Sequence, residues 1–112
     1  IVSEAYKDRI IAAKDIDSAV TGRSHGHPVR SLRNAMTRED SKLEAEGKSF
    51  EELEYLTLGT LRKAVMEGDI VHGTVMAGQI AGLVSEKQSA KEIIDEIMSE
   101  ATNLLKNAGS LV

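Results

Sequence analysis

Cysteine is absent from this chain of 112 residues, which excludes disulfide bonds, thiolate zinc ligands and a cysteine nucleophile. Aromatic residues are nearly as scarce, because only Tyr6, Phe50 and Tyr55 occur and tryptophan is missing. Any core must therefore consist of aliphatic side chains and methionine, which favours helices and close backbone contacts. The lack of cysteine also suits a cytoplasmic protein.

Long apolar runs are missing too. The longest weakly polar run, residues 75–84, is interrupted by Gln79, whereas a membrane-spanning helix needs about 20 apolar residues. The N-terminus has neither a basic region nor an initiator methionine, so no signal peptide is visible and the chain is expected to begin inside a longer protein. A net charge of −4 argues weakly against generic nucleic-acid binding. We expect neither a membrane nor a nucleic-acid partner.

The length excludes a complete (β/α)₈ barrel, which needs about 250 residues. The apolar content of 41% is nevertheless enough to bury a core. Residues 1–4 read as the end of a strand, residues 5–14 have helical spacing, and residues 15–21 alternate as a strand up to Gly22. This order predicts a parallel β-α-β unit.

After a loop over residues 22–28, the pattern is helical. Pro28 suits a helix start, and an apolar stripe follows it to about Gly47. Ser49 and Glu52 form a capping box, and the next helix is expected to break near Gly59. A second box, Ser89 with Glu92, opens an amphipathic helix that ends at Gly109.

The histidines offer a weak functional signal. His25 and His27 lie two residues apart, and His72 is distant in sequence. A zinc site needs three or four ligands, and no carboxylate completes one at a motif spacing, so we expect no metal. Exposed loop histidines, or hydrogen-bonding members of a loop near a pocket, are the favoured interpretation.

The glycine-rich segment is more informative. Gly78 and Gly82 have a small-xxx-small spacing that would place both on one helix face, where a backbone, a helix or a flat ligand could approach closely. The residues alone favour tight packing over a ligand. Gln79, the one polar residue of the run, is able to pair with a ligand edge or with a neighbouring backbone group.

Four segments together resemble a known family: residues 6–17, residues 26–30, residues 68–83 and residues 89–94. They are similar to bacterial FMN-dependent enoyl-acyl carrier protein reductase, within the nitronate monooxygenase (2-nitropropane dioxygenase) superfamily. The most specific element is the block Gly-Asp…Gly-x-x-Met-Ala-Gly-Gln, which ends at Gln79.

The resemblance implies an α/β fold: the C-terminal part of a TIM-type (β/α)₈ flavin barrel with a helical covering segment, mostly helical within this chain. Residues 1–28 would be the last β-α-β part of the barrel, and residues 29–112 the helical segment with the glycine-rich block and the C-terminal helix. It also implies FMN as cofactor, bound near four consecutive residues: Met76, Ala77, Gly78 and Gln79. NAD(P)H would be the cosubstrate. Catalytic residues are expected upstream of this chain.

By the same resemblance, the enzyme would reduce a trans-2-enoyl group carried by acyl carrier protein, in fatty-acid biosynthesis. Its partners would be that substrate, the N-terminal barrel portion of the same enzyme and a second copy in a homodimer. Two alternatives stay open: an FMN-dependent nitronate monooxygenase, and a helical interaction module without chemistry.

Overall fold

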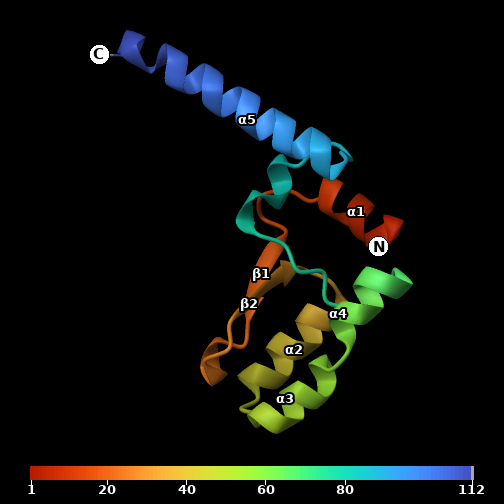
Figure 1. Ribbon diagram of the computed structural model, residues 1–112. Coiled ribbons are helices and arrows are strands. Elements are labelled where there is room, and N and C mark those ends of the chain that lie inside the picture. The colour runs from red at the N-terminus through yellow and green to blue at the C-terminus, as the bar shows by residue number, and fades with distance from the viewer. Residues whose placement is uncertain (112) are drawn as a thin grey trace.

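The computed structural model describes residues 1–111, and within them a mostly helical chain surrounds a small two-stranded sheet (Figure 1). In chain order the elements are α1 (Glu4–Ile11), β1 (Ser18–Thr21), η1 (Arg23–His25), β2 (Val29–Leu32), α2 (Ala35–Ala45), α3 (Phe50–Thr57), α4 (Thr60–Arg62), η2 (Lys63–Glu67), η3 (Gln79–Leu83), α5 (Ala90–Asn107) and η4 (Ala108–Leu111). η2 is a π-helix, and the other η elements are 3₁₀ turns. Val112 lies outside the described residues.

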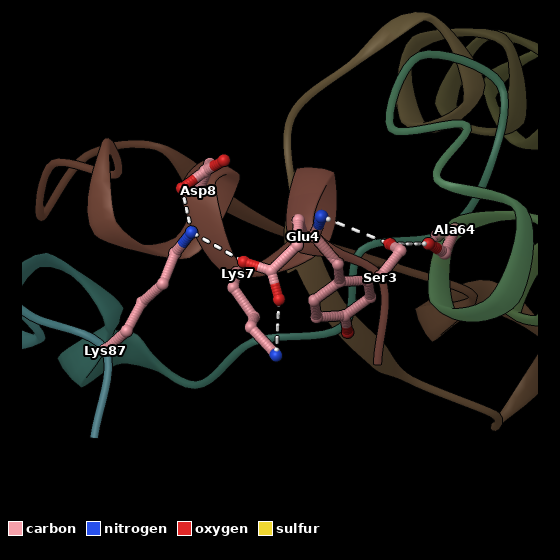
Figure 2. Close-up of polar contacts among 7 residues, drawn as sticks. Ser3, Glu4, Lys7, Asp8, Ala64 and Lys87 are labelled. Atoms are coloured by element: carbon pink, nitrogen blue, oxygen red, sulfur yellow. Dashed lines mark hydrogen bonds and ion pairs between the residues drawn. The ribbon is translucent and has the colours of Figure 1, made fainter. Parts of the chain in front are cut away.

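The expected strand over residues 1–4 is wrong, because α1 begins at Glu4 and residues 1–3 belong to no strand. Ser3 caps this helix, its Oγ accepting a hydrogen bond from the Tyr6 N–H at 3.3 Å. The same hydroxyl donates to the Ala64 carbonyl at 2.9 Å (Figure 2). One side chain therefore both starts α1 and ties it to η2.

The expected parallel β-α-β unit is also wrong, because β1 pairs with β2 in an antiparallel hairpin. Residues 22–28 are too few for a parallel crossover, which takes a dozen or more. Gly22 makes the tight return possible: its φ is +78°, and a Cβ there would lie 2.3 Å from the His27 carbonyl oxygen. Thr21 pairs with Val29, so the hairpin joins residues from both sides of the boundary that was expected after residue 28. The division into residues 1–28 and 29–112 stays a prediction.

Pro28 does not begin a helix as expected, since β2 follows it and α2 starts only at Ala35. Asn34 provides the cap: its side chain accepts from the Thr37 N–H at 3.0 Å, and the Thr37 hydroxyl accepts from the Asn34 N–H at 2.8 Å. The Asn34 amide also donates to the carbonyls of Ile70 and Gly73, at 2.8 and 2.7 Å. The start of α2 is thereby fixed to the segment that leads into the glycine-rich block.

Other expectations are confirmed. Ser49 and Glu52 cap α3 reciprocally, as Ser89 and Glu92 do for α5. Gly59 separates α3 from α4 with a φ of +76°, a backbone conformation that glycine adopts at little cost.

The buried core is small and aliphatic, as the shortage of aromatic residues predicts. It consists of Ala13, Leu32, Ala64, Val75 and Ala81, with partly buried side chains packed against them. Leu32 and Val75 are joined by a backbone hydrogen bond of 2.8 Å, so β2 and the segment after Gly73 meet at the centre of the molecule.

Helix α5 extends away from this core (Figure 1), and none of its residues is buried. Lys87, just before it, anchors its start to α1 through ion pairs with Glu4 at 2.8 Å and Asp8 at 2.7 Å (Figure 2). Hydrogen bonds from Lys7 and then Lys87 lower the pKa of Glu4 from 4.5 to about 2. No helix within residues 1–111 combines the length and apolarity that crossing a membrane requires.

Candidate functional site

A cavity of about 380 Å³ lies between the β1–β2 hairpin and helices α2 and α3. Seventeen residues line it: Thr21, Gly22, His25, His27, Val29, Ser31, Met36, Thr37, Asp40, Phe50, Leu53, Glu54, Thr57, Thr60, Leu61, Thr74 and Met76. They come from distant parts of the sequence, and the fold brings them together because α2 packs on both the hairpin and α3.

The threonines of the wall are largely satisfied within the protein. The hydroxyls of Thr60 and Thr74 pair at 2.7 Å, and the Thr60 hydroxyl also donates to the Thr57 carbonyl at 2.6 Å. The Thr37 hydroxyl is used in the Asn34 capping box. Because these polar atoms already have partners, the threonines add methyl surface more than hydrogen-bonding capacity to the cavity. The wall is therefore more apolar than its residue names suggest.

The hairpin loop closes one end of the cavity, and Glu44 of α2 holds that loop in place. Its carboxylate accepts hydrogen bonds from the Gly22 N–H at 3.0 Å, the Ser24 N–H at 2.8 Å and the Ser24 hydroxyl at 2.6 Å. The bonds from Ser24 lower the pKa of Glu44 below its ordinary value of 4.5. The carboxylate thus fixes the beginning and the middle of the 3₁₀ turn that carries His25.

The two loop histidines flank Phe50, the first residue of α3. The ring centroids of His27 and Phe50 are 5.0 Å apart, and those of His25 and Phe50 are 6.2 Å apart, both in tilted arrangements. His25 Nε2 is buried and has no hydrogen-bond partner within residues 1–111. The histidines do belong to a loop beside a cavity, but the expected hydrogen bonds of their side chains are not found within residues 1–111.

Of the residues expected near FMN, only Met76 lines this cavity. Its backbone pairs with Ser31 in an isolated bridge at the edge of β2, and its carbonyl accepts a hydrogen bond of 2.7 Å from the Tyr6 hydroxyl. Burial raises the pKa of Tyr6, so this phenol stays a hydrogen-bond donor over the physiological pH range. Met76 is therefore held from both sides, by the hairpin and by α1.

The other three residues lie just outside the cavity wall. Ala77 is partly buried against the core, whereas Gly78 and Gln79 are exposed. A Cβ on Gly78 would meet nothing within 4 Å, so its surface is open to a flat group. The Gln79 side-chain amide makes no hydrogen bond within the part of the chain that the structure describes, and it is free to bind a ligand.

The shared helix face expected for Gly78 and Gly82 is wrong, because Gly78 precedes the short turn η3 in an extended conformation. The two glycines have separate roles. A Cβ on Gly82 would lie 2.8 Å from the backbone nitrogen of Asp15, so packing explains this glycine, as the residues alone favoured. Gly78 is the one that leaves space for a ligand.

Sequence reasoning missed most of the cavity wall. Leu53, Thr60 and Thr74 belong to no motif, and their spacing in the sequence does not mark them as neighbours. Glu44 is one of several charged residues in the same helical segment, so its residue type alone does not mark it as part of the site. Two signals were available: Met76, and the His-Gly-His loop that follows Gly22, whose histidines line the cavity.

The remaining histidine lies elsewhere. His72 Nδ1 is 3.5 Å from the Asp69 carboxylate, in the turn after η2, and does not line the cavity. Hydrogen bonds from the His72 and Val71 backbone lower the pKa of Asp69. Among the described residues, no three His, Cys, Asp or Glu side chains are grouped to hold a metal ion.

Comparison with known proteins identifies the family. A family model of nitronate monooxygenase matches residues 1–100. FabK from Thermotoga maritima is 36% identical, with a TM-score of 0.90, over 100% of this chain and 35% of that chain. A methionine-to-alanine mutant of FabK from the same organism is 32% identical, with a TM-score of 0.79, over 99% of this chain and 32% of that chain. The chain spans about a third of the length of these structures. It belongs to the nitronate monooxygenase family, as its sequence resemblance indicated, and has the fold of part of a TIM-barrel flavoenzyme.

Proposed function

We propose that this chain is the C-terminal part of an FMN-dependent enoyl-acyl carrier protein reductase. The enzyme would reduce a trans-2-enoyl thioester with electrons from NAD(P)H, as one step of fatty-acid biosynthesis. The observation that supports this most is the likeness to FabK, which extends over the whole chain at 36% identity and a TM-score of 0.90. An upstream barrel portion of the same enzyme would supply the catalytic residues.

The block from Met76 to Gln79 would contribute to FMN binding. Gly78 offers open space for a flat ring, and the exposed Gln79 offers a side-chain amide that has no hydrogen-bond partner within residues 1–111. The Met76 side chain is 42% exposed beside the cavity, so its polarizable thioether is available to contact a ring system. When bound there, FMN supplies the hydride chemistry, while Met76, Ala77, Gly78 and Gln79 hold and orient it.

The chain's own contribution is positional. Tyr6 and Ser31 fix the backbone of Met76 from opposite sides, so the block is presented by a rigid scaffold rather than by a free loop. The helical segment α2–α3 and the hairpin loop line a cavity beside it. Residues that line such a cavity would help to orient a substrate beside the flavin.

A direct assay tests the proposal. The full-length flavoenzyme, loaded with FMN, is expected to oxidise NADH or NADPH in the presence of crotonyl-coenzyme A and to release the saturated thioester. Replacement of Gln79 by alanine is expected to weaken FMN binding about fivefold to tenfold, corresponding to roughly 1 kcal/mol for a lost hydrogen bond. Gln88→Ala, at a half-buried position before α5 where the amide donates to Glu96, is the control. An enzyme that binds FMN and reduces no enoyl thioester would contradict the proposal.

The second candidate is nitronate monooxygenase, which is favoured by the family model that matches residues 1–100. In that case the reduced flavin would react with oxygen, and the substrate would be a nitroalkane anion. Oxygen consumption with nitroethane or 2-nitropropane, measured on the same preparation, separates the two. Turnover with the nitroalkane and none with crotonyl-coenzyme A would support this alternative.

A further inference from the structure

From the cavity between the hairpin and α2–α3, we infer that this part of the chain receives the alkyl tail of the enoyl substrate, and that Phe50 with the hairpin loop limits the length of that tail. The inference rests on the proposed function. It adds a binding site and a specificity determinant within this chain.

The cavity has two distinguishable ends. Met76, expected at the flavin side, is bridged to Ser31 in β2. Val29 lies two residues back along the same strand, about 7 Å away at the usual rise, and the hairpin loop begins beyond it. Figure 1 shows that the hairpin loop, which carries η1, lies near the C-terminal end of α2 and the N-terminal end of α3. The cavity thus runs from the expected flavin side toward the loop.

The cavity wall suits an alkyl chain. Leu53, Met36 and Val29 supply apolar surface to it, and two threonines of the wall, Thr60 and Thr74, have their hydroxyls satisfied internally. Burial of each methylene in such a place stabilises a complex by about 0.8 kcal/mol. Because methionine adapts its shape, the wall accepts a chain without a single fixed contour.

The loop end has a different character. His25 and His27 of the hairpin loop line the cavity there, and Asp40 of α2, which is 6% exposed, also belongs to the cavity wall. An alkyl tail pushed against a buried carboxylate would remove its remaining water without replacing any hydrogen bond, which is costly. Phe50, in contact with both histidines, covers this end. The tail is therefore accommodated up to the Phe50–His27 contact and opposed beyond it.

Two substitutions with opposite expected effects test the inference in the full-length flavoenzyme. Leu53→Phe places a larger side chain in the cavity wall and so leaves less space for an alkyl tail. The ratio of kcat/KM for trans-2-decenoyl-coenzyme A to kcat/KM for crotonyl-coenzyme A should fall about tenfold. Phe50→Ala removes a ring from the loop end of the cavity. The ratio of kcat/KM for trans-2-tetradecenoyl-coenzyme A to kcat/KM for crotonyl-coenzyme A should rise about threefold or more.

Matched controls are available on nearby exposed positions. Leu58→Phe follows α3, where Leu58 is 76% exposed, and Tyr55→Ala lies within α3, where Tyr55 is 86% exposed; neither lines the cavity. Both controls should keep the parental chain-length ratios. Phe50 is itself 40% exposed, so its variant should fold even where Leu53→Phe does not.

The outcomes separate this inference from the function beneath it. If the parent enzyme reduces enoyl thioesters and both cavity variants keep the parental ratios, the alkyl-tail site is refuted while the reductase function stands. If the parent enzyme reduces none of the three thioesters, the proposed function is refuted and the tail site with it. Opposite shifts in the two variants, absent from the controls, support the site.

Discussion

At the scale of single residues, Glu44 has the clearest energetic role in the site. Its carboxylate accepts three hydrogen bonds from Gly22 and Ser24 and so fixes the loop at one end of the cavity. Glu44→Ala should lower the free energy of unfolding by about 1–2 kcal/mol at pH 7, because hydrogen bonds to a charged group are lost. Urea unfolding measures this, and Glu39→Ala, at an exposed position on the same helix, is the control.

The same carboxylate predicts a pH dependence. Its folded-state pKa is lowered by the bonds from Ser24, so its stabilising contribution is complete above the unfolded value of about 4.5 and is lost as the pH falls through the folded-state pKa. The difference in stability between the parent and Glu44→Ala should therefore shrink on acidification below pH 4.5. A difference that stayed constant down to pH 2 would show that the carboxylate charge is not responsible.

At the scale of elements, α1 acts as a support for the segment that carries Met76. The Tyr6 hydroxyl reaches the Met76 carbonyl at 2.7 Å, across 70 positions of sequence. Tyr6→Phe removes this bond, worth about 1 kcal/mol, and should speed hydrogen exchange of the neighbouring Ala77 amide about fivefold. Tyr55→Phe, on the exposed side of α3, should leave that exchange rate as it is. Equal effects of the two substitutions would assign the change to something other than this contact.

The elements also show what local patterns are able to predict. The capping boxes at Ser49 and Ser89 and the break at Gly59 were predictable because each depends on residues a few positions apart. The β2 strand was missed because Pro28 also suits a helix start, and only pairing with β1 decides between the two. The cap at Asn34 is local, because Thr37 is three positions away, but a helix start expected at Pro28 concealed it. The bonds from the Asn34 amide to residues 36 and 39 positions away were not predictable from any local pattern. The cavity depends wholly on such distant pairings.

At the scale of the whole molecule, the chain is less compact than its length allows. Its radius of gyration is 17.7 Å, whereas a compact domain of 112 residues has about 13 Å. Its accessible surface is 7941 Å², against roughly 6,000 Å² for a compact protein of 12.1 kDa. Helix α5 adds to this surface, because its large apolar side chains are all exposed: Ile93, Ile94, Ile97, Met98, Leu104 and Leu105.

An exposed apolar face of this size predicts self-association of the 112-residue chain when it is produced alone. Size-exclusion chromatography with light scattering should give a mass above 12.1 kDa, and an anilinonaphthalene dye should fluoresce on binding. Replacing Ile97 and Leu104 by glutamate should lower both the apparent mass and the dye fluorescence. Replacing Thr102 and Lys106 by glutamate should leave both unchanged. A monomeric parent chain that binds no dye would contradict this view of α5.

The close approach at Gly73 and Gly82 has a consequence for how sequences of this kind can diverge. Neither glycine has a positive φ, and each is required by volume, because a Cβ would lie 2.3 Å from the Asp69 carbonyl oxygen or 2.8 Å from the Asp15 nitrogen. Asparagine often replaces glycine where only torsion matters, as at Gly26, which has open space around it. At Gly73 and Gly82 no replacement keeps the spacing. Substitution is therefore tolerated at Gly26 in the hairpin loop, whereas Gly73 and Gly82, on either side of the Met76 block, must stay glycine.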